Sequence, residues 1–370
     1  MGIFSRLKSF INPPKNPDIE SAFNYQMEHL PTLWLLGKTG AGKSSLIHAV
    51  TKDSEVVIGD GFRPCTRTSS SYDFPKEKPL MRFLDTRGLG EADYDATEDI
   101  AECQGRSNAL IIVMKAEDPE QGGIINALKQ IKKSRVIKAL VLVHTGVHLI
   151  ACSQEREQCI AYNQSQVDKA WGSSVAAVNV DFELEDGSSF GVEALKSRLA
   201  DLVPILAQLI KDEAYTNSEE KVFAALKTEV LWYAGTAGAS DAIPAVGLVS
   251  VPLIQGKMLH SLANQYGIDW DKKTMSEFIG SLGAGFGIQY ASRLGLRQLV
   301  KLIPVYGQTV GAATAVAISF CSTYAIGRVG CKYMYHKNKG ESVPEAELKD
   351  IYRSAFDSMK EVAKNETNKE

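Results

Sequence analysis

The chain has 370 residues, of which 44% are hydrophobic and 23% charged, and its formal net charge is −3 at pH 7. This length leaves room for two domains, and the slightly acidic balance gives no reason to expect a nucleic-acid partner. The six cysteines form no C-x-x-C pair, and no signal peptide opens the sequence. We therefore expect a cytoplasmic protein with reduced thiols, without a zinc site or a disulfide framework.

Residues 1–29 are predicted to form an amphipathic N-terminal segment followed by a spacer. Ile3, Phe4, Leu7, Phe10 and Ile11 fall on one helical face. Such a short basic helix can lie on an anionic lipid surface, or it can dock on the protein's own helices. The prolines between residues 12 and 17 should end this helix.

An apolar strand then leads into a phosphate-binding loop. Residues 33–36 are Leu-Trp-Leu-Leu, and residues 37–45 read G-K-T-G-A-G-K-S-S, a full match to G-x-x-x-x-G-K-[ST]. We expect backbone N–H groups to surround the phosphates and a helix to start near Lys43. Lys43 would reach the β- and γ-phosphates, and the Ser44 hydroxyl would ligate Mg²⁺. The predicted nucleotide-binding residues of this loop are Gly37, Lys38, Thr39, Gly40, Ala41, Gly42, Lys43, Ser44 and Ser45.

A second apolar strand, at 80–85, runs into the sequence D-T-R-G. Asp85 would hold Mg²⁺ through a water, and the Gly88 N–H would bond the γ-phosphate. The two motifs together resemble the GTPase class of P-loop proteins. The resemblance implies a mobile loop whose threonine completes the Mg²⁺ shell, and Thr66 is the candidate, with Thr68 in reserve. The predicted catalytic residues are Lys43, Thr66 and Gly88, and the predicted metal ligands are Ser44, Thr66 and Asp85.

One departure from the GTPase pattern concerns the attacking water. Small GTPases orient this water with a glutamine after the switch glycine, whereas this chain has Leu89. A leucine cannot position water, so we expect slow intrinsic hydrolysis. A dimer, a partner, or one of Arg63, Arg67 and Arg87 would have to supply the missing group.

The other departure concerns the base. After the strand at 139–143, Thr145 stands at the threonine of the usual Asn/Thr-Lys-x-Asp motif, Gly146 replaces the lysine and His148 replaces the aspartate. Families similar to the chloroplast-import and immunity-associated GTPases share such losses, and a histidine near this place contacts their base. The resemblance therefore favours GTP over ATP. The strand at 175–178 leads into the loop expected to close over the base. The predicted base-binding residues are His144, Thr145, His148 and Asn179.

Alternating strand and helix patterns predict an α/β fold with a doubly wound, mostly parallel sheet and ligand at the carboxyl ends of the strands. Helical periodicity over residues 192–210 should close this GTPase domain, which we place at 30–212. The predicted strands are about 31–37, 70–74, 80–85, 109–114, 139–144 and 175–180.

An all-α C-terminal domain is predicted at 222–335, followed by a charged helix and tail at 344–370. Residues 230–256 hold one charged residue and residues 302–327 hold none. Such runs are long enough to cross a bilayer, although their prolines and polar residues also fit a buried soluble hairpin. A weak repeat, I-P-A-V-G at 243 and I-P-V-Y-G at 303, suggests two similar helical hairpins. The whole resembles bacterial Era- and septin-like GTPases that carry a C-terminal hydrophobic helical domain.

The sequence thus predicts a GTP- and Mg²⁺-binding switch protein with slow or partner-stimulated hydrolysis. Its expected partners are a second copy through the GTPase domain and a membrane surface or bilayer through residues 222–335. Two alternatives stay open at this point. One is a nucleotide-gated scaffold with vestigial hydrolysis, and the other is an ATPase.

Overall fold

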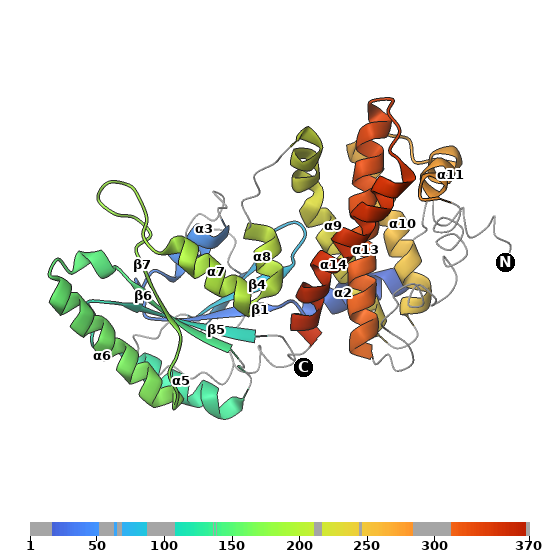
Figure 1. The fold of residues 1–370 in the computed structure, drawn as a ribbon. Helices are drawn as coiled ribbons and strands as arrows, with labels where there is room; N and C mark the ends of the chain where they lie inside the picture. Colours follow the sequence, from blue (N-terminus) through green and yellow to red (C-terminus); the bar gives the residue numbers. More distant parts are fainter. Residues whose placement is uncertain are drawn as a thin grey trace. The chain divides into compact units, whose positions relative to one another are not determined.

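The computed structural model describes residues 17–51, 63–64, 69–86, 108–135, 137, 139–210, 217–243, 246–283 and 312–367. The chain forms two compact units. One unit spans residues 29–212, and the other is built from helices that precede and follow it in the sequence (Figure 1). We call them the sheet unit and the helical unit.

The sheet unit is built around a seven-stranded sheet with the order β2-β3-β4-β1-β5-β6-β7. From β4 to β7 in this order, neighbouring strands run parallel, whereas β3 pairs antiparallel with both β2 and β4. The strands are β1 (Thr32–Leu36), β2 (Arg63–Pro64), β3 (Ser69–Phe74), β4 (Met81–Thr86), β5 (Asn108–Lys115), β6 (Ala139–Thr145) and β7 (Ala177–Val180).

Helices cover both faces of this sheet, which is why its central strands are continuous apolar runs. Figure 1 shows α5 and α6 on one face and α3, α7 and α8 on the other. Trp34 and Leu110 from the sheet pack with Leu128 of α5 and Val167 of α6 in one buried cluster. The helices are α3 (Lys43–Thr51), α5 (Gly122–Ser134), the 3₁₀ turn η1 (Val147–Leu149), α6 (Ser153–Trp171), α7 (Val192–Leu202) and α8 (Pro204–Ile210).

The helical unit packs α9 (Ser218–Ala242) along α13 (Ala312–Asn338), and α13 against α14 (Glu345–Thr367). α10 (Gly247–Gln265) also packs on α9, and α11 (Lys272–Ser281) follows it in the chain. Side-chain caps fix two helix starts: Asn217 accepts the Glu220 N–H, and Asp271 accepts the Thr274 N–H.

α2 (Pro17–Glu28) belongs to the helical unit, although it lies before the sheet unit in the sequence. Ile19 and Ala22 are buried with Ala237 of α9 and Ile254 of α10. The Phe23 ring stacks on Trp232 of α9, with centroids 4.7 Å apart. This apolar face explains the position of α2, which was predicted only as part of a spacer.

The predicted fold class and all six predicted strands are confirmed, each strand to within two residues at either end. The predicted helix over 192–210 is divided between α7 and α8, because Val203 is extended (φ −131°) ahead of Pro204. Among the residues that the structure describes, no helix combines the length and apolarity that a membrane span requires. The amphipathic helix predicted near residues 3–11 and the second copy of the repeat at 303–307 lie outside the described residues.

Candidate nucleotide-binding site

The loop between β1 and α3 has a backbone that only its glycines allow. Gly40 and Gly42 have φ values of 77° and 94°, which residues with a Cβ rarely adopt. A Cβ on Gly37 would come within 2.5 Å of the Val113 carbonyl oxygen, so this glycine packs directly on the backbone of β5. α3 then begins at Lys43, as predicted. Its positive end therefore faces the loop, the arrangement that favours a bound anion.

Lys43 is held over this loop by backbone carbonyls. Its Nζ donates to the Gly37 oxygen at 2.7 Å and to the Lys38 oxygen at 3.1 Å, and it lies 3.7 Å from Oδ1 of Asp85. Burial lowers the pKa of Lys43, and the neighbouring Asp85 carboxylate opposes that shift. The loop lysine and the carboxylate at the end of β4 are thus brought together from two strands.

The structure describes only some of the other residues predicted to bind phosphate or metal. Ser44 and Ser45 lie in the first turn of α3, and Thr39 and Gly40 are exposed at the tip of the loop. Thr66, Thr68, Gly88 and Leu89 lie outside the described residues, as do Arg67 and Arg87. Arg63 is the first residue of β2.

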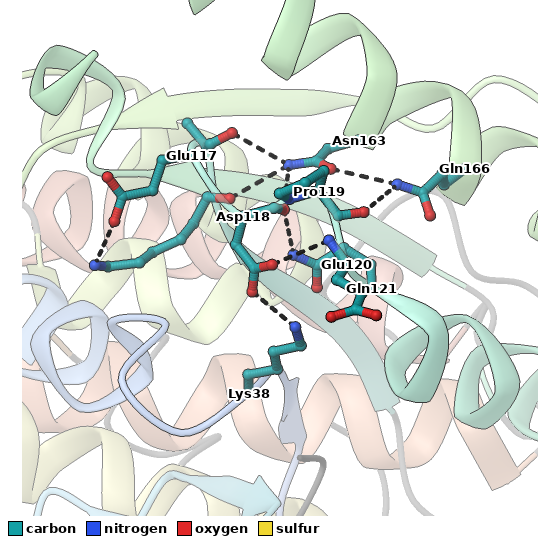
Figure 2. Close-up of polar contacts among 10 residues, drawn as sticks. Lys38, Glu117, Asp118, Pro119, Glu120, Gln121, Asn163 and Gln166 are labelled. Carbon is teal, nitrogen blue, oxygen red and sulfur yellow. Dashed lines mark hydrogen bonds and ion pairs between the residues drawn. The ribbon is translucent and has the colours of Figure 1, made fainter.

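The segment after β5, residues 116–121, forms a polar loop beside the phosphate loop (Figure 2). We call it the β5–α5 loop. Oδ2 of Asp118 accepts from Lys38 Nζ at 2.8 Å, and Oδ1 accepts from the Glu120 N–H at 3.0 Å. The Gln121 side chain donates to the Asp118 carbonyl at 2.7 Å. Asp118 therefore joins the β5–α5 loop to the second residue of the phosphate loop.

Asn163 of α6 lies behind the β5–α5 loop and is fully buried. Its Nδ2 is within 3.2–3.4 Å of the carbonyl oxygens of Lys115, Ala116 and Asp118. Gln166, one turn further along α6, donates to the Pro119 carbonyl at 3.1 Å (Figure 2). A buried amide that serves several carbonyls fixes the path of an otherwise irregular segment.

Thr145, at the end of β6, contacts the phosphate loop from another side. Its hydroxyl donates to the Ala41 carbonyl at 2.8 Å, and its carbonyl accepts from the Ala116 N–H at 2.9 Å. Thr145 is buried, so its described contacts support the loop backbone. The adjacent Gly146 has φ 65° and no side chain that could reach the loop.

The structure corrects the prediction for His144. Its side chain has no exposed surface, because it points into the interior from β6. Burial lowers the pKa of His144 to about 4, so the imidazole is neutral at pH 7. A fully buried neutral ring is a core residue in this arrangement and offers a base no surface to contact.

His148 lies in η1 and has a carboxylate partner that the sequence did not reveal. Its Nδ1 is 2.6 Å from Oδ2 of Asp181, the residue that follows β7. The His148 ring meets the Phe190 ring edge-on, with centroids 4.7 Å apart. Asp181 is buried, whereas His148 and Asn179 are exposed. The geometry thus leaves His148 and Asn179 as accessible candidates for base contact.

Residues 32–166 match the family model described as 50S ribosome-binding GTPase. This segment holds the phosphate loop, the Lys43–Asp85 pair and Thr145. It is a P-loop GTPase domain. The chain is also 28% identical over 124 residues to Magnetosome membrane protein 22 of Magnetospirillum gryphiswaldense. That alignment covers 33% of this chain and 62% of the relative's length.

Several solved GTPases are similar to the chain at low identity. Toc33 from Arabidopsis thaliana is 15% identical, with 52% of this chain and 94% of Toc33 covered and a TM-score of 0.36. The G domain of the T. maritima FeoB iron transporter is 19% identical, with 47% and 99% covered and a TM-score of 0.30. Bacterial selenocysteine-specific elongation factor EF-Sec is 19% identical, with 48% and 29% covered and a TM-score of 0.35.

Sequence reasoning missed three residues of the sheet unit that the structure brings to the site: Asp118, Asn163 and Asp181. Asp118 and Asp181 each follow a predicted strand directly or within a few residues, which is where ligand-side residues gather in an open α/β sheet. That position was a usable signal. Asn163 lies in the middle of a long polar helix and carries no such signal.

Proposed function

We propose that the protein is a GTP-binding switch that uses Mg²⁺ and hydrolyses GTP slowly. The observation that carries the proposal is the meeting of Lys43 and Asp85, 3.7 Å apart, at a loop with two left-handed glycines. A cation, a carboxylate and a helix start are the groups that a magnesium–phosphate ligand needs. This geometry favours a nucleoside triphosphate over ligands without phosphate.

In this proposal Lys43 contacts the β- and γ-phosphates once it leaves its carbonyl partners. Ser44, Asp85 and Thr66 would hold Mg²⁺, which when bound neutralises charge that develops on the phosphates. The Gly88 N–H would sense the γ-phosphate. Leu89 cannot orient water, so stimulation would come from a second copy, a partner or an arginine.

The base end of the site favours guanine in this proposal. With Nδ1 of His148 engaged by Asp181, Nε2 is the ring nitrogen left for a ligand. A neutral imidazole with its proton on Nδ1 accepts at Nε2, which suits the N1–H and N2–H donors of guanine. Adenine presents an acceptor at N1 instead. Asn179 is a second candidate, near the end of β7 and one residue before Val180, which pairs with Thr145.

Chain continuity supports coupling between the site and the helical unit. Only residues 29–31 separate α2 of the helical unit from β1, which leads directly into the phosphate loop. We therefore propose that the nucleotide state is passed to the helical unit. Association with a membrane surface is also part of the proposal, supported by the name of the magnetosome relative and by the sparse charge of residues 230–256.

The test is binding and turnover of GTP and ATP by the purified chain, with and without anionic liposomes, over a range of protein concentration. We expect GTP to be preferred and its hydrolysis to rise with lipid or with protein concentration. Lys43→Ala should weaken binding by at least about 100-fold, because it removes a charge-assisted contact to phosphate. If Lys43→Ala and the wild-type chain bound nucleotide with equal affinity, the proposed site would be wrong. Tight binding without turnover in every condition would replace the enzyme with a nucleotide-gated scaffold.

A further inference from the structure

We propose that Asp118 is a positioning residue for the phosphate loop, which it holds through Lys38, and that Asn163 holds Asp118 in place. The inference rests on the proposed nucleotide binding and adds to it the part of the chain that sets the shape of the loop. No residue of the β5–α5 loop belongs to the nucleotide motifs, yet this loop contacts their second residue (Figure 2).

The Asp118 carboxylate has both oxygens engaged, so its direction is fixed. One oxygen accepts from the Glu120 N–H within the β5–α5 loop, and the other faces Lys38 Nζ at 2.8 Å. The backbone carbonyl of the same Lys38 accepts from Lys43 Nζ at 3.1 Å. A shift of Lys38 would therefore move a carbonyl that holds the main phosphate-binding side chain.

Asn163 gives the β5–α5 loop a rigid backing. Its side chain is 0% exposed, and its Nδ2 approaches three carbonyl oxygens, two of which flank Glu117 in the loop. Removing such a buried donor leaves those carbonyls without it, which destabilises the loop backbone where no water replaces the donor. The order of support therefore runs from α6 through the β5–α5 loop to Lys38.

Among the described residues, the other contacts that hold the phosphate loop come from Lys43, β5 and β6. Gly37 packs on Val113, and Ala41 is held by Thr145. Gly146, which follows Thr145, has no side chain to add a contact. Three glycines in the loop give its unbound backbone much conformational freedom, and each fixed point lowers the entropy that nucleotide binding must remove.

The decisive variant is Asp118→Asn, because two explanations predict opposite signs for it. Removing a negative charge beside a polyanion site should tighten nucleotide binding if only Coulomb attraction matters. If Asp118 positions the loop, the loss of its ion pair should weaken binding instead. We expect GDP to dissociate about twofold to fivefold faster, the range for a partly exposed ion pair. Dissociation of a fluorescent GDP analogue, chased with excess GDP in the presence of Mg²⁺, measures this rate.

A double-mutant cycle separates positioning from charge. In the Lys38→Met background, Asp118→Asn should cause no further acceleration, because the pair is already broken. Glu117→Gln is the matched control: it removes a negative charge from the neighbouring residue, whose partner is Lys115 rather than the phosphate loop. It should leave the dissociation rate unchanged or lower it slightly. Asn163→Leu should accelerate GDP dissociation at least as much as Asp118→Asn. Circular dichroism checks that this variant is folded.

Several results would overturn the inference. They are tighter binding in Asp118→Asn, additive effects of Asp118→Asn and Lys38→Met, or equal effects of Asp118→Asn and Glu117→Gln. A drop in melting temperature with an unchanged dissociation rate would make the pair structural only. Failure of the wild-type chain to bind any nucleotide would instead remove the proposed function itself, so the two failures are distinguishable.

Discussion

The two units of this protein place their polar groups in opposite ways. In the sheet unit one large buried cluster between sheet and helices is apolar, and the polar groups of the candidate site gather at the carboxyl ends of the strands. In the helical unit, polar and charged side chains lie buried between helices. Glu229 of α9 accepts from Ser261 of α10, and Gln255 of α10 donates to Thr323 of α13.

This difference explains why the runs with few charges in the C-terminal region fitted two interpretations, a bilayer-crossing segment and a buried soluble hairpin. The run over 230–256 holds a single charged residue, but its hydroxyl and amide groups find partners on neighbouring helices. Thr236 of α9, for instance, donates to Gln26 of α2 at 2.5 Å. Hydrogen bonds between helices specify which faces meet, whereas an apolar surface alone would allow several packings. The helical unit should therefore be sensitive to single polar substitutions.

The largest effect should follow from a buried charge pair that joins α9 and α13 in the helical unit. Glu219 of α9 accepts from both terminal nitrogens of Arg328 of α13, at 2.6 and 3.0 Å, and both side chains are largely buried. Glu219→Gln leaves the arginine with reduced compensation, so we expect a loss of about 4 kcal/mol in the unfolding free energy of this unit. Hydrogen exchange of α9 and α13 measures the loss locally.

The control for Glu219 is an exposed ion pair of the same unit, Glu277 with Lys337. Glu277→Gln should cost less than about 1 kcal/mol. Nucleotide binding by the sheet unit should survive Glu219→Gln if the two units hold separate polar systems. Loss of GTP binding in this variant, at a temperature where the sheet unit stays folded, would show that the contrast between the units is wrong.

His144 is one of the buried polar residues of the sheet unit, and its burial leads to a pH prediction. Its pKa falls from the ordinary 6.5 to about 4 on burial, so between these values the unfolded chain binds a proton that the folded chain does not. Stability should therefore decrease as pH drops from about 6.5 to about 4, by up to about 3 kcal/mol. Urea unfolding at several pH values should show a flatter dependence in His144→Leu. The exposed His48→Gln should keep the wild-type dependence.

The sequence was a good guide to the strands and to the phosphate loop, because both depend on local patterns. Apolar runs of four to eight residues and a loop motif with its flanking strand and helix need no knowledge of distant contacts. The antiparallel edge formed by β2 and β3 was harder to predict from the sequence, since β3 begins with three serines. Its pairing depends on β4, which has the apolar pattern.

The supporting residues could not be predicted in the same way. Asn163 contacts residues 45–48 positions earlier in the chain, and Gln26 contacts residues more than 200 positions later. No periodicity links such pairs, and a polar residue on a helix is far more often solvated. His144 and His148 were indistinguishable as base contacts in the sequence, because only the structure shows which one β6 buries.

The smallest expected effect concerns base selection, and it tests whether the polar edge of the sheet unit acts as a unit. Asp181 is buried, and its Oδ2 lies 2.6 Å from Nδ1 of His148, a contact that favours the tautomer with the proton on Nδ1 and the acceptor at Nε2. Asp181→Asn can present either an acceptor or a donor to Nδ1, so this selection of one tautomer is weakened. We expect the preference for GTP over ATP to fall about fivefold, or about 1 kcal/mol.

Competition of GTP and ATP against a fluorescent GDP analogue measures this preference, with Asp186→Asn as control. Asp186 lies in the same loop after β7, but its carboxylate accepts from the N–H and hydroxyl of Ser188. If both variants lose affinity for GTP and ATP in equal proportion, Asp181 only stabilises the loop. A fall in the GTP/ATP ratio confined to Asp181→Asn would mean that a histidine–carboxylate pair takes over base selection where the usual aspartate is replaced.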